Sequence, residues 1–93
     1  MQTMALIVVT PQRQVLSTQV QWVDLPAASG QMRALPEHAP TLGALGAGEV
    51  RYQDAAGAEK SFTVSGGFLE VLGDKVTLLA DSAGEKATTP APA

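Results

Sequence analysis

The 93-residue sequence contains no cysteine, which excludes a disulfide framework and a thiolate metal site. Its six Lys and Arg residues are scattered and its formal net charge is −3, so it lacks the basic patch that binds nucleic acid or anionic lipid. The longest uncharged apolar run, Met4 to Val9, is far shorter than the roughly 20 residues that span a bilayer. No basic segment or cleavage pattern marks it as a signal peptide. We therefore expect a cytoplasmic protein with no membrane-spanning segment.

Residues that carry out catalysis or hold metals are equally scarce. His38 is the only histidine, and without cysteine a zinc site would need several carboxylates from distant positions. A nucleophile pair of His38 with Ser29 or Ser65 lacks the G-x-S-x-G pattern. The Ser65-Gly66-Gly67 run has neither the Lys-Ser/Thr sequence nor the helix of a phosphate-binding loop, and instead predicts a bulge or a close approach of strands. The sequence predicts no enzyme activity, metal or cofactor.

What is present is a series of short strand patterns. Residues 49–53 and 61–65 alternate polar and apolar side chains at a period of two, as half-buried strands do. The apolar runs 4–9 and 67–72 have strand length, and segments 15–17 and 20–25 continue the series. Pro26 cannot donate a backbone hydrogen bond, and it is expected to end the last of these. Turn residues at 11–14, 27–30, 54–57 and 73–74 separate the runs, so an all-β sandwich or barrel is expected.

The length and the 45% hydrophobic content predict a single folded domain, over residues 1–83. Residues 84–93 combine prolines, threonines and small side chains, and we expect a solvated tail there. No window shows the apolar periodicity and caps of a helix. Of the four aromatic residues, Phe62 and Phe68 stand in core-like alternation, while Trp22 fits either the core or a binding surface.

Three motifs carry a family resemblance. The first is His38-Ala39-Pro40 within the apolar segment 30–45, which is too broken for a helix and predicts a stiff binding loop. The second is Ser65-Gly66-Gly67-Phe68-Leu69-Glu70-Val71, and the third is Lys75-Val76-Thr77-Leu78-Leu79-Ala80-Asp81. Over about residues 4 to 83 the chain resembles the epsilon subunit of F-type ATP synthase. Glu37 departs from the family pattern, which usually has glycine before the histidine.

This resemblance implies an all-β, ten-stranded flattened sandwich of two five-stranded sheets, without the carboxyl-terminal helical hairpin of longer members. It also implies a non-catalytic rotor subunit of the central stalk, peripheral to the cytoplasmic face of a bacterial cell membrane, that links the gamma subunit to the c-ring during proton-driven ATP synthesis. Because the hairpin acts as a brake and in some members binds ATP, neither property is expected of this chain.

The resemblance also implies two sites of contact with other subunits, and neither is a catalytic site. The loop expected to face the c-ring comprises Ser29, Gly30, Gln31, Met32 and Arg33. The surface expected to face gamma comprises Glu37, His38, Ala39, Pro40, Thr41, Leu42 and Gly43, with Ser65 nearby. The alternative is a free-standing β-sandwich module that binds a carbohydrate or peptide, although such modules usually present a row of aromatic side chains.

Overall fold

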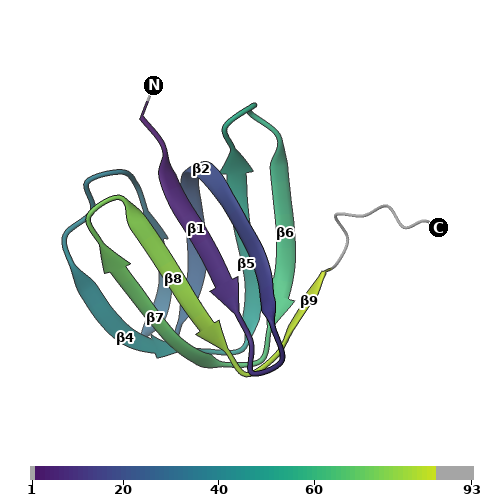
Figure 1. Cartoon of the computed structure of the whole chain (residues 1–93). Helices are drawn as coiled ribbons and strands as arrows, with labels where there is room; N and C mark the ends of the chain where they lie inside the picture. Colours follow the sequence, from purple (N-terminus) through teal and green to yellow (C-terminus); the bar gives the residue numbers. More distant parts are fainter. Residues whose placement is uncertain (1, 86–93) are drawn as a thin grey trace.

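The computed structural model describes residues 2–85, with the side chain of residue 85 left aside, and these residues form nine strands and no helix (Figure 1). No segment in that range is therefore a helix that crosses a membrane. In chain order the strands are β1 (Met4–Val9), β2 (Gln14–Ala27), β3 (Gly30–Ala34), β4 (Thr41–Leu45), β5 (Gly48–Asp54), β6 (Glu59–Val64), β7 (Gly67–Leu72), β8 (Lys75–Ala80) and β9 (Ala83–Glu85).

The long strand β2 joins two layers into a sandwich. Its first half pairs with β1, which continues through β8 and β7 to β4, and we call this set layer 1. Its second half pairs with β3 on one side and with β5 on the other, and β5 continues through β6 to β9, which gives layer 2. Counting β2 once in each layer gives two layers of five strands. The expected all-β sandwich is confirmed, with two of the expected ten strands merged into one.

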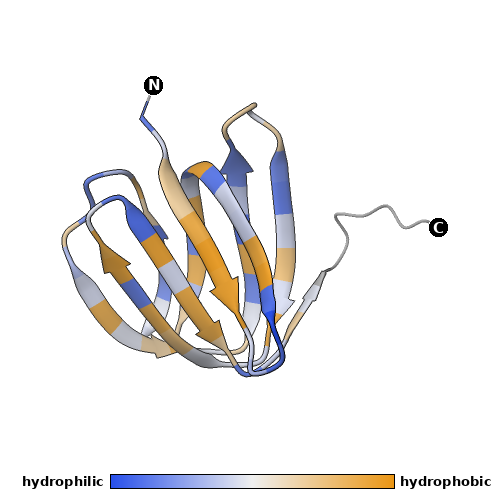
Figure 2. Cartoon of the chain, in the orientation of Figure 1, coloured by the Kyte–Doolittle hydropathy of each residue, from blue (hydrophilic) through white to orange (hydrophobic). Residues whose placement is uncertain are grey.

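The core forms where the apolar side of each strand turns inward. β1 and β8 alternate buried and less buried positions, as a period of two requires when one face packs and the other meets water. Figure 2 shows bands of different hydropathy along β8, whereas β1 is orange throughout because both of its faces are apolar. The largest fully buried side chains are Met4, Leu6, Val8, Val20, Val23, Leu25, Val50, Leu69, Val71, Val76 and Leu78.

Two expectations about local structure are wrong. Pro26 does not end a strand, because β2 continues to Ala27 and pairs Pro26 with Gln31 of β3. The Pro26 carbonyl accepts from the Gly46 N–H on the β4 side, and in a strand the N–H of a residue points to the same side as its carbonyl. The position at which Pro26 lacks an N–H therefore faces away from β3. The segment 30–45 is also not one stiff loop, since β3 and β4 occupy most of it and leave only residues 35–40 between them.

The glycines of the second motif behave as expected. Gly66 and Gly67 have φ angles of 128° and 138°, which side chains rarely adopt. A Cβ at Gly67 would collide with the backbone carbonyl of Leu79 on the neighbouring strand β8. This close approach of β7 and β8 requires glycine.

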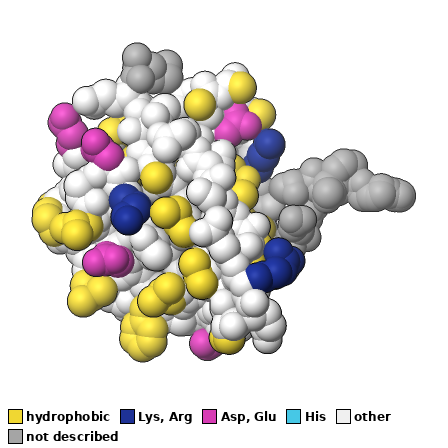
Figure 3. All heavy atoms as spheres, in the orientation of Figure 1, with side chains coloured by type: hydrophobic (Ala, Val, Ile, Leu, Met, Phe, Trp, Pro, Cys, Tyr) yellow, Lys and Arg dark blue, Asp and Glu magenta, His cyan; other side chains and the backbone are white. Residues whose placement is uncertain are grey.

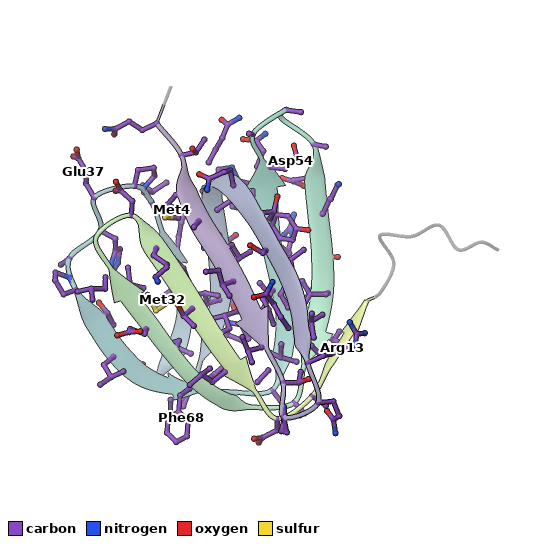
Figure 4. The ribbon with its side chains drawn as sticks, in the orientation of Figure 1. Met4, Arg13, Met32, Glu37, Asp54 and Phe68 are labelled. Atoms are coloured by element: carbon purple, nitrogen blue, oxygen red, sulfur yellow. The ribbon has the colours of Figure 1, made fainter. Side chains whose placement is uncertain are left out.

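The connections gather at the two ends of the sandwich. Near the amino terminus, the amide of Gln2 donates to Glu37 in the β3–β4 connection, and the turn after Asp54 lies at the same end (Figure 4). At the opposite end Gly46 bonds to Pro26, and Ser65 bonds to Ser82. β9 includes residues 84 and 85, the first two of the expected tail, and residues 86–93 of that expected tail lie outside the described part of the chain.

Candidate docking surfaces

Layer 1 presents a mostly apolar outer surface. Across the four strands β4, β7, β8 and β1, one row of facing residues is apolar throughout: Ala44, Phe68, Leu79 and Val9. The neighbouring row consists of Leu42, Glu70, Thr77 and Ile7. We call the outward side chains Ile7, Val9, Leu42, Ala44, Phe68, Leu72 and Leu79 the apolar face. In Figure 3 hydrophobic side chains gather at the lower left, in the region of β4, β7 and β8.

Several members of the apolar face are too exposed for core residues. Leu42 is 79% exposed, Phe68 62%, Leu72 56% and Leu79 52%. Phe68 projects away from the sandwich in Figure 4. Shallow hollows of about 150 and 300 Å³ lie on either side of Phe68 and Leu79, the first bordered by Leu42 and Glu70 and the second by Val9 and Pro11. A contiguous exposed apolar patch with hollows marks an interaction surface.

Glu70 is the one acidic side chain among the facing rows of the apolar face. It lies between Leu42 on β4 and Thr77 on β8, and no ion pair within residues 2–85 includes it. A partner that covers this face must therefore leave Glu70 in contact with water or present a cation to it.

Layer 2 has the opposite character. Its outer surface carries a cross-strand row of Arg33, Asp24 and Arg51, from β3, β2 and β5. The guanidinium of Arg33 donates to both carboxylate oxygens of Asp24, at 2.6 and 3.0 Å, and lies 4.2 Å from the ring centre of Trp22. Arg51 pairs with Glu59 at 3.4 Å. We call Trp22, Asp24, Arg33, Glu49, Arg51 and Glu59 the charged face.

These contacts determine what Arg33 can do. The hydrogen bonds that Arg33 donates to Asp24 raise the pKa of Arg33 above its already high value, so the guanidinium stays charged. The charge of Arg33 is paired with Asp24, and the plane of its guanidinium lies against the ring of Trp22.

Of the loop residues expected to face the c-ring, Ser29, Gly30 and Gln31 are exposed at the β2–β3 turn. Met32 packs against the core, and Arg33 belongs to the charged face.

The residues expected to face gamma are divided by the structure. Leu42 lies on the apolar face, and Thr41 and Gly43 alternate with it. Residues Glu37 to Pro40 lie in the connection before β4, where the His38 Nδ1 is 2.7 Å from the Ala39 carbonyl. Ser65 is at the other end of β4 and β7, so it is separated from His38 by at least the length of β4, roughly 13 Å over four residue steps. Its hydroxyl accepts from Ser82.

Glu37 adopts a backbone conformation that favours glycine. Its φ is 70°, and among residues 2–85 it is the only residue other than glycine with a positive φ. Glycine adopts this left-handed conformation without steric cost, whereas a residue with a Cβ does so at roughly 1 kcal/mol.

Sequence reasoning missed two of the most exposed members of the apolar face. Phe68 was expected in the core but is exposed, and Leu79 was not singled out. The alternation of residues in β7 indicates this exposure. Phe68 and Leu72 lie on the same side of the strand as Glu70, whereas Leu69 and Val71 lie on the opposite side. A charged residue between two apolar ones of the same parity indicates that their face is turned to solvent.

The chain matches the family described as "ATP synthase, Delta/Epsilon chain, beta-sandwich domain" over residues 3–86. A protein named ATP synthase epsilon chain from Solibacter usitatus is 48% identical over 81 residues, which are 87% of this chain and 60% of that protein. One of the same name from Dehalococcoides mccartyi strain BAV1 is 47% identical over 83 residues, or 89% of this chain and 59% of the relative.

Solved structures with the same fold come from mitochondrial ATP synthases. A chain in the OSCP/F1/c-ring structure from Euglena gracilis aligns with a TM-score of 0.84 at 21% identity, over 89% of this chain and 53% of that one. A chain in the central stalk/c-ring structure from Tetrahymena thermophila aligns with a TM-score of 0.75 at 13% identity, over 98% and 75%.

The fold and the family match define a β-sandwich domain of ATP synthases. Together with the relatives' identity they show that the chain belongs to the ATP synthase delta/epsilon family, with ATP synthase epsilon chains among its relatives. It spans about 60% of the length of the curated relatives that it resembles.

Within residues 2–85, no three His, Asp or Glu side chains are grouped closely enough to hold a metal ion.

Proposed function

We propose that this chain is an epsilon-type subunit of the central stalk of an F-type ATP synthase, which links gamma to the c-ring and makes and breaks no covalent bond. The observation that carries the proposal is the apolar face of layer 1, which fits a stable protein partner in a member of this family. The names of the relatives and of the two similar structures support the same reading.

In this proposal gamma covers the apolar face. The row Ala44, Phe68, Leu79 and Val9 supplies the apolar centre that protein interfaces have, and the hollows beside it accept side chains of the partner. Gamma is expected to place a basic side chain opposite Glu70. Residues Glu37 to Pro40 lie in the connection that leads into β4 and belong to the rim of the same contact, whereas Ser65 lies at the far end of the sandwich.

The exposed β2–β3 turn is proposed to face the c-ring. Ser29, Gly30 and Gln31 offer hydroxyl, backbone and amide groups, which suit the short polar loops expected of the ring. Because Arg33 is already paired with Asp24, it contributes little to this contact, and the interaction depends on neutral hydrogen bonds rather than ion pairs. The subunit would then be held at the cytoplasmic face of the bacterial membrane through the complex.

The sandwich suits the transfer of torque because both contacts lie on one rigid body. β2 runs through both layers, so a force applied to the β2–β3 turn acts directly on the strand that pairs with β1 of layer 1.

A free-standing carbohydrate-binding module is less favoured, because each outer face carries a single aromatic residue, Trp22 or Phe68, while Tyr52 and Phe62 are buried. Stacking on a sugar chain usually needs a row of aromatics.

The test compares one substitution on each outer face for binding to the gamma subunit of the same synthase. Phe68→Ser removes the largest exposed apolar side chain, and we expect the affinity for gamma to fall by at least ~30-fold, since loss of a central anchor costs about 2 kcal/mol or more. Trp22→Ser, on the charged face, is the matched control and should leave the affinity within about twofold. Circular dichroism would first establish that both variants fold. Undiminished binding by Phe68→Ser would contradict the proposal.

A further inference from the structure

Strand β4 is the edge of layer 1, and most of its outer side is unpaired (Figure 1). It pairs with β7 along its full length, but with β2 only through Leu45 and Ala27. The Ala44 carbonyl accepts from the Ala28 N–H, so the backbone polar groups of Ala44 point away from β7. Residues two apart in an antiparallel ladder point their polar groups to the same side. The N–H and C=O of Leu42 therefore also point away from β7, toward the open edge.

This edge lacks the features that usually protect a strand from pairing with another chain. Its sequence, Thr-Leu-Gly-Ala-Leu, contains no charged residue, and the neighbouring edge strand β3 differs in carrying Arg33. Natural sheet edges are commonly protected by charged side chains, by proline or by bulges. Leu42 on this same strand is the most exposed large apolar side chain among residues 2–85. An unprotected edge and an apolar face thus meet on one strand.

We propose that gamma adds a β-strand to layer 1 along β4, so that the two subunits share one sheet. This inference rests on the proposed function and specifies how gamma is bound. Strand addition supplies affinity through backbone hydrogen bonds and specificity through alternate side chains. The added strand lies about 4.8 Å from β4 and extends the apolar face beyond Leu42, so its outward residues are apolar.

The shared ladder is short. Because the Ala44 carbonyl already accepts from Ala28 and Gly46 already donates to Pro26, the new strand pairs mainly with the N–H and C=O of Leu42. Pro40 just before β4 has no N–H to offer. The partner segment therefore needs only a few extended residues, with the apolar face providing the remaining contact.

Amide hydrogen exchange tests this on the unmodified chain, with and without the gamma subunit of the same synthase. The Leu42 amide should exchange quickly in the free protein and be slowed at least ~100-fold in the complex, because a hydrogen-bonded amide exchanges only when the pairing opens. The Leu69 amide, in the central strand β7, serves as an internal reference that is slow in both states. An unprotected Leu42 amide in a fully formed complex would overturn the proposal.

Two substitutions at Leu42 separate the edge from the face. Leu42→Pro removes the outward N–H, and the β4–β7 ladder does not use that donor, whereas Leu42→Ala keeps the N–H and also loses the leucine side chain. We expect the proline variant to bind gamma at least ~10-fold more weakly than the alanine variant, which corresponds to about 1.4 kcal/mol. Equal weakening would overturn strand addition while leaving the apolar face as the docking site. No weakening of binding by either variant or by Phe68→Ser would overturn the proposed function as well.

Discussion

The two outer faces of this sandwich are built from the same strand geometry and differ in what they present to solvent. The three ion pairs found within residues 2–85, Arg33–Asp24, Arg51–Glu59 and Lys60–Asp54, all involve layer 2 and its β5–β6 turn. Layer 1 instead exposes Leu42, Phe68, Leu72 and Leu79, with none of these pairs. Both layers contribute fully buried side chains to the core, so the difference lies in their outer faces.

This contrast indicates that the outer face of layer 2 serves local structure and that the outer face of layer 1 serves binding. Exposed ion pairs contribute only ~0–1 kcal/mol each, so the charged face chiefly keeps layer 2 solvated. Exposed leucine and phenylalanine side chains add little to the stability of the isolated domain and make it prone to association. The proposed partner on layer 1 would account for their presence on the apolar face. Substitutions on layer 1 should therefore affect binding, and those on layer 2 should affect local structure.

The largest change in stability is expected from substitution of Gly67, which tests whether layer 1 depends on the close approach of β7 and β8. Gly67→Ala would place a Cβ against the Leu79 carbonyl at a φ of 138°. Strain and overpacking together should lower the free energy of unfolding by about 3 kcal/mol.

Gly43→Ala, in the adjacent strand β4, is the matched control. A Cβ there meets nothing within 4 Å, so the expected change is within about 0.5 kcal/mol. Urea denaturation of both variants measures the difference. Equal stability of the two variants would mean that the β7–β8 approach is not constrained as described.

A smaller effect is expected on the charged face when Arg33 is replaced by alanine. The guanidinium covers the ring of Trp22, the only tryptophan, so its removal exposes the indole to water. Tryptophan emission should shift to longer wavelength, while affinity for gamma stays unchanged. Phe68→Ser is the reciprocal control and should leave the emission maximum in place. A loss of gamma binding in Arg33→Ala would contradict the separation of the two faces.

The smallest effect concerns pH. Backbone hydrogen bonds from Ala58 and Ala56, together with Lys60, lower the pKa of Asp54 below its usual value. A carboxyl whose pKa is lower when folded than when unfolded contributes stability above the unfolded value, and this contribution disappears as the pH falls through the folded pKa. Stability should therefore decline below about pH 4.

Asp54→Asn keeps an acceptor oxygen without the titration, and thermal unfolding between about pH 2 and 6 should show a weaker decline for this variant. An identical pH profile for Asp54→Asn and the unmodified protein would contradict this role of Asp54.

Most of the fold follows from local sequence. The alternation in residues 61–65 predicts β6, and Asp54 to Gly57 predicts the turn before it, because period-two burial and turn residues act over a few positions. The segment 30–45 was harder, since β4 is only five residues long and its middle residue is glycine. Pro26 was misread because the direction in which its missing N–H points depends on neighbouring strands.

The sequence by itself determined the strand periodicity, the need for glycine in the Ser65-Gly66-Gly67 run, the absence of cysteine ligands and the family to which the chain belongs. Each of these depends on residue type and short spacing. Only the tertiary structure decided that β2 serves both layers and that Arg33 is held by Asp24 and Trp22. These depend on which strands become neighbours, and such pairings join residues far apart in the chain, so no local pattern contains them.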